Sequence, residues 1–432
     1  MLLTFKALGM LVVLVVLVWQ TLAAKGHASD AGVARKIMLS YLQLCGIISN
    51  FPIPWPLFFR AIFGIQSVVS GAAGHLLDLK CAMQQASAAD VFYGWLAVYS
   101  LIPAVLLGSY SLYRWRKGDN ETKVMAAVVF LLYFFYPQMC SQLFAAVSCR
   151  SVEGKLYLTV DLEERCWHGR HLYWMIGCGV PTAVFGVVGL PCLALRTLQR
   201  LKQRRRMSVE REEQERLADE CRLQLGILYD GYRPELYWWE VTAVARKVFI
   251  AMLAELMEGA LQTQCSMLLL LLFVIATVQF RPYASRVLQA LEVGSLMVCL
   301  LCLWAGGVFF QYPGCATTYG DMEGWMWCKV SGGLVGFILV AFLAMGSGCC
   351  IFLTTEKKHA TMGKWCTNWC RRACGKKMLQ GTESAEVEMG SRDGYQQSGA
   401  SHAVTVTNPL HPIAMSGRMG QQMALSQQSS QI

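Results

Sequence analysis

The sequence LQTQCSMLLLLLFVIATVQF, residues 261–280, contains no charged side chain. A run of about 20 apolar residues is what an α-helix needs to cross the roughly 30 Å hydrocarbon core of a bilayer. The whole chain has the same character, because 55% of its 432 residues are hydrophobic and 15% are charged. A typical soluble domain carries about 25% charged residues. The sequence therefore predicts a helical membrane protein, and a soluble enzyme is the least expected class.

Further apolar runs along the chain predict an all-α, polytopic bundle of about nine crossings. The region 37–73 is counted once, because the sequence FPIPWP (51–56) interrupts it. The other runs are Ala7–Ala24, Val91–Tyr113, Val124–Val147, Leu172–Leu195, Tyr237–Leu256, Val287–Gln311 and Val330–Leu353. The first run also resembles a cleaved signal peptide, because the small residues of TLAAK (21–25) loosely fit a cleavage site.

Basic residues in the short loops predict the orientation of the bundle. Three basic segments, 114–123, 196–222 and 357–377, are separated by even numbers of predicted spans and therefore fall on one side. Arg35 and Lys36, which follow the first run, are assigned to the same side as flanking residues. This side is predicted to be cytoplasmic, and it includes the C-terminus.

The opposite side receives two loops with a cysteine pair each, Cys149 with Cys166 and Cys315 with Cys328. Disulfides persist outside the cytosol, so the cysteine and charge patterns agree and predict the plasma membrane or another secretory-route membrane. The alternation in LYLTV (156–160) predicts that the first pair closes a small outer hairpin. The acidic residues of this loop either attract cations at a pore mouth or form a solvated turn.

The most distinctive segment is GILYDGYRPELYWWEVTAVARK, residues 226–247. Glu240 and Lys247 are seven residues apart and share a helix face, with Arg246 beside them. Charges inside a membrane usually face the bundle or a water-filled cavity, and in one interpretation these three form a gating or permeation network. The sequence favours the other interpretation, in which the aromatic residues around Trp238 anchor the helix at the interface, and the charges extend toward the headgroups or pair to hold the helix.

Beyond the last run, the segment WCTNWCRRACGKK (365–377) places cysteines four residues apart on one helix face. Its tryptophans and basic residues favour a juxtamembrane helix with palmitoylated cysteines. A zinc site is less favoured, because histidines and C-x-x-C pairs are missing from the segment. The candidate palmitoylation sites are Cys349, Cys350, Cys366, Cys370 and Cys374.

Composition divides the chain into four parts: an N-terminal signal-anchor span with its flank (1–34), a multi-span domain (35–353), the basic Cys/Trp segment (354–378) and a disordered cytoplasmic tail (379–432). The net charge is +10, and the basic residues cluster beside apolar runs, which favours membrane lipids over nucleic acid as partners. No P-loop, G-x-S-x-G or H-E-x-x-H motif is present, so no catalytic, cofactor-binding or metal site is predicted.

Several short motifs occur in an order that resembles one family. They are KIMLSYLQ (36–43), WP (55–56), Cys81, YFFYP (133–137), the loop 149–166 with LYLTVD, GVP (179–181), LYDGYRPELYWWE (228–240) followed by RK, and FRPY (280–283). Over about residues 35–353, the chain resembles the TRP-like transmembrane module of protist and algal surface proteins, which is distantly similar to fungal flavin-carrier and polycystin-like proteins.

The resemblance implies an ion channel or transport protein, with cations as the permeant species and a homo-oligomeric assembly. Fold-level similarity does not by itself decide activity, so two alternatives stay open. One is a receptor or adhesion-type anchor that signals through its cytoplasmic segments. The other is a carrier of lipids or small molecules, which a dry apolar groove would favour.

Overall fold

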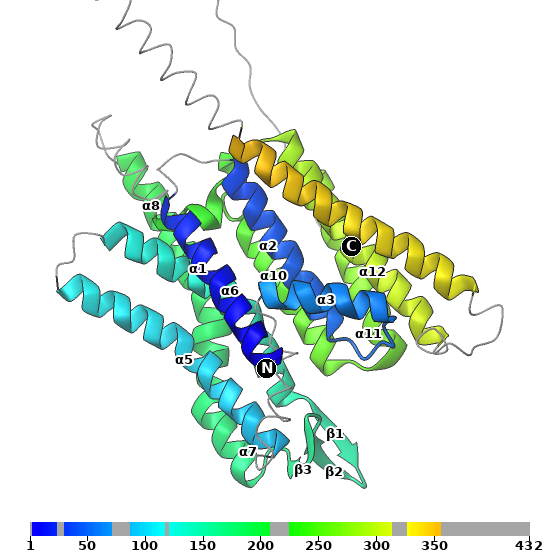
Figure 1. The fold of residues 1–432 in the computed structure, drawn as a ribbon. Coiled ribbons are helices and arrows are strands. Elements are labelled where there is room, and N and C mark those ends of the chain that lie inside the picture. Colours follow the sequence, from blue (N-terminus) through cyan, green and yellow to red (C-terminus); the bar gives the residue numbers. More distant parts are fainter. Residues whose placement is uncertain are drawn as a thin grey trace, which may run out of the picture. The chain divides into compact units, whose positions relative to one another are not determined.

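The computed structural model describes residues 2–23, 30–70, 87–116, 121–207, 224–312 and 326–355, which are almost entirely helical (Figure 1). The helices are α1 (Leu2–Ala23), α2 (Asp30–Ser49), α3 (Leu57–Ser70), α5 (Ala88–Trp115), α6 (Glu121–Val147), α7 (Gly169–Trp174), α8 (Leu190–Met207), α10 (Trp239–Leu256), α11 (Gly259–Phe280), α12 (Arg286–Gln311) and a last helix, Met326–Thr355. Two π-helical segments, Met175–Gly179 and Thr182–Gly189, connect α7 to α8.

Seven helices in the described part of the chain are long and apolar enough to cross a membrane. They are α2, α5, α6, the continuous helix Gly169–Arg200, α11, α12 and the last helix. Two other predicted crossings do not meet this criterion of length and apolar composition. Helix α10 carries four charged residues within 18, and the apolar stretch found among the described residues of α1 is Leu11–Gln20, which is too short to be counted. The predicted multi-span, all-α fold is confirmed.

The region that FPIPWP interrupts forms two helices of different kinds. Helix α2 is central, because 83% of its most apolar window is buried, compared with 17% for Gly169–Arg200. The prolines end α2, and α3 then packs against it at an angle (Figure 1). With 14 residues, α3 is about 21 Å long at 1.5 Å per residue, which is shorter than the membrane core. The prediction that this region crosses once therefore fits α2.

Aromatic packing holds α3 against α12. The ring of Trp55 lies 5.0 Å from that of Phe63, and the ring of Phe59 lies 5.6 Å from that of Phe309. Gly306 makes this close approach possible, because a Cβ there would lie 2.8 Å from the Ile53 side chain and 3.0 Å from Trp55. The aromatic cluster therefore depends on a residue without a side chain in α12.

The predicted outer hairpin is a three-stranded antiparallel sheet, called the hairpin sheet below. Its strands are β1 (Cys149–Val152), β2 (Lys155–Leu158) and β3 (Asp161–Arg165), in the order β1-β2-β3. Glu153 and Gly154 both have positive φ, as the favoured two-residue hairpin turns require. The disulfide Cys149–Cys166 is confirmed and closes the ends of the sheet. The sequence predicted a single hairpin and did not reveal the third strand, β3, which is mostly exposed and acidic.

Several predicted features cannot be placed. Cys328 is disulfide-bonded, but its predicted partner Cys315 lies outside the described residues. Cys366, Cys370, Cys374 and the predicted disordered tail lie outside them as well. Cys349 and Cys350 are half-buried free thiols near the end of the last helix, and their palmitoylation stays a prediction.

Removing the disulfide tests how far it stabilises the fold. The double substitution Cys149→Ser with Cys166→Ser frees a cross-link between residues 17 apart in sequence. Loss of such a cross-link typically costs about 2–4 kcal/mol, so the Tm in detergent should fall by several degrees. Cys192→Ser, at an exposed free thiol, is the matched control and should leave the Tm unchanged. An unchanged Tm in the double variant would show that the helices alone hold the hairpin sheet in place.

Candidate functional site: a buried charged network

Two loops at one end of the bundle pair with each other and place two tyrosines side by side. The loop before α10 and the loop between α11 and α12 form an isolated β-bridge between Tyr232 and Tyr283. Their rings lie 4.9 Å apart, and their hydroxyl oxygens lie 3.4 Å apart. Gly231 permits this arrangement, because its φ is +88° and a Cβ there would lie 2.5 Å from Val33 of α2. Both hydroxyls are directed into the bundle, that of Tyr232 toward α10 and that of Tyr283 toward α12.

Helices α2 and α10 run in the same direction with matched polar positions. The Nζ of Lys36 lies 2.8 Å from Oε2 of Glu240, and the Nζ of Lys247 donates to Oε1 of Gln43 at 2.9 Å. In both pairs the two partners are 204 residues apart in the sequence. Moving seven residues along each helix therefore leads from the first pair to the second. Parallel helices require an odd number of crossings between them, and the predicted order of spans places three there: Val91–Tyr113, Val124–Val147 and Leu172–Leu195.

The Glu240 carboxylate has a second donor in Tyr232. The hydroxyl of Tyr232 donates to Oε2 of Glu240 at 2.9 Å, and Lys36 lies 4.4 Å from the centre of the Tyr232 ring. Burial and the neighbouring Glu240 raise the pKa of Tyr232 well above its ordinary value. Its hydroxyl therefore keeps its proton and remains a donor. The carboxylate is satisfied by an ammonium group and a phenol in a site that water does not reach.

A second ion pair lies on the α12 side of α10. The Nη1 of Arg246 lies 2.9 Å from Oε1 of Glu292, and Nη2 of Arg246 reaches Oγ of Ser40 at 3.5 Å. The hydroxyl of Tyr283 approaches Oε2 of Glu292 at 3.4 Å. Through the two tyrosines, this pair is connected to the pair formed by Lys36 and Glu240. We call the group the charged network; its members are Lys36, Ser40, Gln43, Tyr133, Tyr232, Glu240, Arg246, Lys247, Tyr283 and Glu292, none more than 9% exposed.

Lys247 is the member whose charge is not matched by a carboxylate at hydrogen-bond distance. Its ammonium group donates to the neutral oxygens of Gln43 and Tyr133, at 2.9 and 3.1 Å. It also lies 4.5 Å from the centre of the Tyr133 ring, and it is 1% exposed. The charged network thus contains three basic side chains and two acidic ones. Burying an unbalanced cation is unfavourable, which is why such residues are usually functional.

The structure brings together the three residues that the sequence singled out. Glu240, Arg246 and Lys247 are 3%, 3% and 1% exposed, so they do not extend toward the headgroups as the interfacial alternative requires. Lys36 was assigned to the cytoplasmic flank, but it lies inside the bundle. The signal for it was present, because Lys36, Ser40 and Gln43 recur at i, i+4 and i+7 on one face of an apolar helix.

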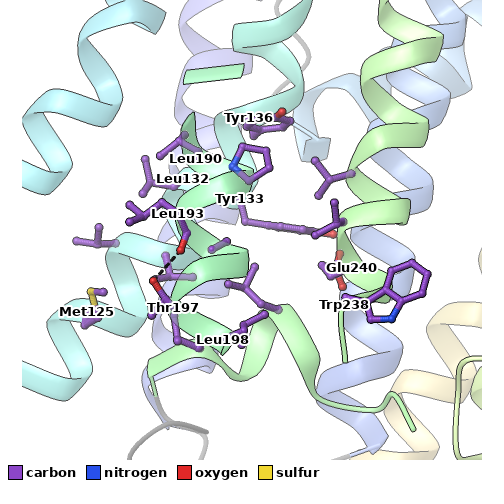
Figure 2. Close-up of a pocket in the computed structure, with 18 of the residues that line it drawn as sticks. Met125, Leu132, Tyr133, Tyr136, Leu190, Leu193, Thr197, Leu198, Trp238 and Glu240 are labelled. Atoms are coloured by element: carbon purple, nitrogen blue, oxygen red, sulfur yellow. Dashed lines mark hydrogen bonds between the residues drawn. The ribbon is translucent and has the colours of Figure 1, made fainter. Parts of the chain in front are cut away.

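A mostly apolar cavity lies next to the charged network. Its volume is about 220 Å³, and it is bounded by α5, α6, α8, residues 225–228 and the start of α10. Tyr133 and Glu240 belong both to the network and to the cavity wall, and Figure 2 shows the phenol of Tyr133 directed toward Glu240. Most other lining residues are aliphatic, for example Leu132, Leu193 and Ala194. A molecule bound in this cavity would touch the network directly.

Comparison with known proteins identifies one family. A family model described as transient receptor potential (TRP) ion channel matches residues 57–369, which is more than half of the chain. The match includes α10, α12 and Tyr133, and begins after α2. A search of curated proteins and a search of solved structures each gave no match.

Neutralising one partner of a buried pair should have a much larger effect than neutralising one partner of an exposed pair. Glu240→Gln leaves Lys36 buried without a counter-charge, which typically costs about 3–5 kcal/mol. Glu258→Gln is the matched control, because Glu258 pairs with Arg150 while both side chains are more than half exposed. An exposed pair contributes about 0–1 kcal/mol. The measurement is Tm in detergent, and equal shifts for the two variants would contradict the buried pairing.

Proposed function

Because this chain belongs to the transient receptor potential (TRP) ion channel family, we propose that it is a cation channel of the membrane whose opening the charged network controls. The single observation that carries this role is Lys247, a basic side chain of α10 that the network buries without a carboxylate at hydrogen-bond distance. The family is not a family of enzymes, and the chain is an integral membrane protein with seven helices, among those described, that could span a bilayer.

The sign and packing of the network favour gating over permeation. A permeating cation would meet three basic side chains and only two acidic ones, and all of them are already engaged with protein groups. A low-dielectric surrounding makes such repulsion strong. The network is therefore better suited to hold α2, α10 and α12 in one arrangement until another arrangement relieves the unbalanced charge of Lys247.

The same proposal includes features that depend on the family and on the sequence. We expect a homo-oligomer, with cations crossing in an assembly of several chains. We also expect residence in the plasma membrane or another secretory-route membrane, with the C-terminus in the cytoplasm. The hairpin sheet would then lie on the outer side, where its acidic residues attract cations to the surface.

Replacing Lys247 tests the gating role. Lys247→Met removes the unmatched cation and leaves two matched ion pairs, so the arrangement described here becomes more favourable. If this arrangement is closed, the open probability in planar bilayers should fall by about tenfold, which corresponds to about 1.4 kcal/mol. The single-channel conductance and the ion selectivity should not change, because Lys247 does not line the conducting path.

A control variant and two contrary outcomes decide whether this experiment supports gating. Lys155→Met, at an exposed lysine of the hairpin sheet, should leave the open probability unchanged. A change of conductance or selectivity in Lys247→Met would assign the network to the permeation path and contradict gating. Absence of current from the unmodified protein under voltage, calcium and membrane stretch would contradict channel function itself.

The apolar cavity favours a second candidate function, transport of a lipid or another apolar small molecule. Its wall is mostly hydrophobic, as binding sites for such molecules usually are. In this role the contact of the cavity with Tyr133 and Glu240 would couple cargo binding to the packing of α6 against α10.

Filling the cavity distinguishes the carrier from the channel. Ala194→Trp places a large side chain in the cavity wall, so transfer of a fluorescent phospholipid between vesicle leaflets should fall severalfold if cargo passes through it. Ala104→Trp, at an exposed position on α5 outside the lining, is the control. Unchanged lipid transfer in Ala194→Trp would argue against the carrier.

A further inference from the structure

His171 is a buried histidine whose two ring nitrogens have partners of opposite kind. The backbone N–H of Trp167 donates to Nδ1 at 3.0 Å, and Nε2 lies 3.0 Å from the carbonyl oxygen of Ala146. An N–H group can only donate, so Nδ1 carries no proton, and the proton on Nε2 donates to the carbonyl. Only the neutral imidazole with its proton on Nε2 satisfies both contacts.

These contacts connect three parts of the structure. Ala146 is in the last turn of α6, Trp167 follows the disulfide of the hairpin sheet, and His171 is in α7. Trp167 has a φ of +63°, an unfavourable backbone conformation for a large side chain. The hydrogen bond from its N–H to His171 therefore stabilises a turn that its own preferences oppose. The side chain of His171 is 0% exposed, so water cannot replace either partner.

We infer that His171 is a proton-binding site that uncouples the hairpin sheet from α6 and α7. A proton from water that binds Nδ1 turns the ring into an imidazolium with two N–H donors. The N–H of Trp167 then faces another donor and loses its acceptor. Histidine is the side chain that most readily changes charge between pH 5 and 8, so mild acid on the side of the hairpin sheet favours the opened turn.

Other ionisable groups lie around His171, and Glu255 of α10 is one of them, because its backbone oxygen accepts from Ser148 at the end of α6. Arg170 forms ion pairs with Asp90 of α5 and Glu164 of β3. Tyr93 of α5 has its ring 6.4 Å from that of His171, and Asp161 of β3 accepts from the backbone N–H of Ala89. His168 is exposed, and its Nδ1 lies 3.0 Å from the carbonyl oxygen of Cys166. Most carboxylates titrate near pH 4, about two units below histidine, but burial raises the pKa of Glu255 at the end of α10 to about 7, so the histidine variants are what assign the effect to one ring.

Hydrogen–deuterium exchange of the full chain in lipid nanodiscs tests the inference. Protection factors, which correct for the pH dependence of the chemical exchange rate, are compared at pH 8.0 and pH 5.5. Protection of the peptide that contains Trp167 should fall severalfold at the lower pH, up to about tenfold, while peptides from α12 should keep theirs. Unchanged protection of the Trp167 peptide in the unmodified protein would overturn the inference without need of a variant.

Two histidine variants assign the effect to one ring. His171→Gln cannot become a cation in this pH range, so the loss of protection at pH 5.5 should disappear. His168→Gln is the matched control three residues away, and it should retain the full pH dependence. Persistence of the pH dependence in His171→Gln, or its disappearance in His168→Gln, would overturn the assignment. If His171→Gln does not fold, His171→Asn, which keeps an acceptor near the position of Nδ1, takes its place.

Discussion

The pairing of charges between α2, α10 and α12 is the constraint on which the arrangement of the bundle depends. Lys36, Glu240, Arg246 and Glu292 are each almost fully buried, and an isolated charge in such surroundings would be strongly unfavourable. Each helix must therefore keep the axial position and rotation that bring its partner within hydrogen-bond distance. A shift of α10 by one turn, about 5.4 Å, would break both ion pairs at once.

The loops that carry the two tyrosines support this arrangement from one end. The β-bridge between Tyr232 and Tyr283 fixes the start of α10 relative to the start of α12. The phenols then supply the hydrogen bonds that a carboxylate needs beyond its ion pair. This explains why a tight turn with a glycine at Gly231 lies next to the charged helix, since a side chain there would push the loop away from α2.

Three features of different chemistry meet around α6. Tyr133 near its middle contacts both Lys247 and the apolar cavity, and Ala146 near its end accepts from His171 of α7, next to the hairpin sheet. Packed helices tend to move as units between discrete arrangements, because interiors are dense and poorly compressible. A change at the cavity or at the hairpin sheet therefore has a physical route to the charged network through the position of α6. In the family to which the chain belongs, such a route would connect ligand or proton binding to the conducting state.

The sequence by itself determined the membrane character, most of the helices and the disulfide Cys149–Cys166, and it singled out Glu240, Arg246 and Lys247 as candidate site residues. Local composition and periodicity carry this information, because the length of an apolar run and the spacing of charges are properties of one segment. Only the tertiary structure decided the partners. Lys36 and Glu240 are 204 residues apart, and no local pattern specifies which of several basic residues a buried carboxylate will meet. The same holds for His171, whose neutral state depends on a carbonyl from another helix.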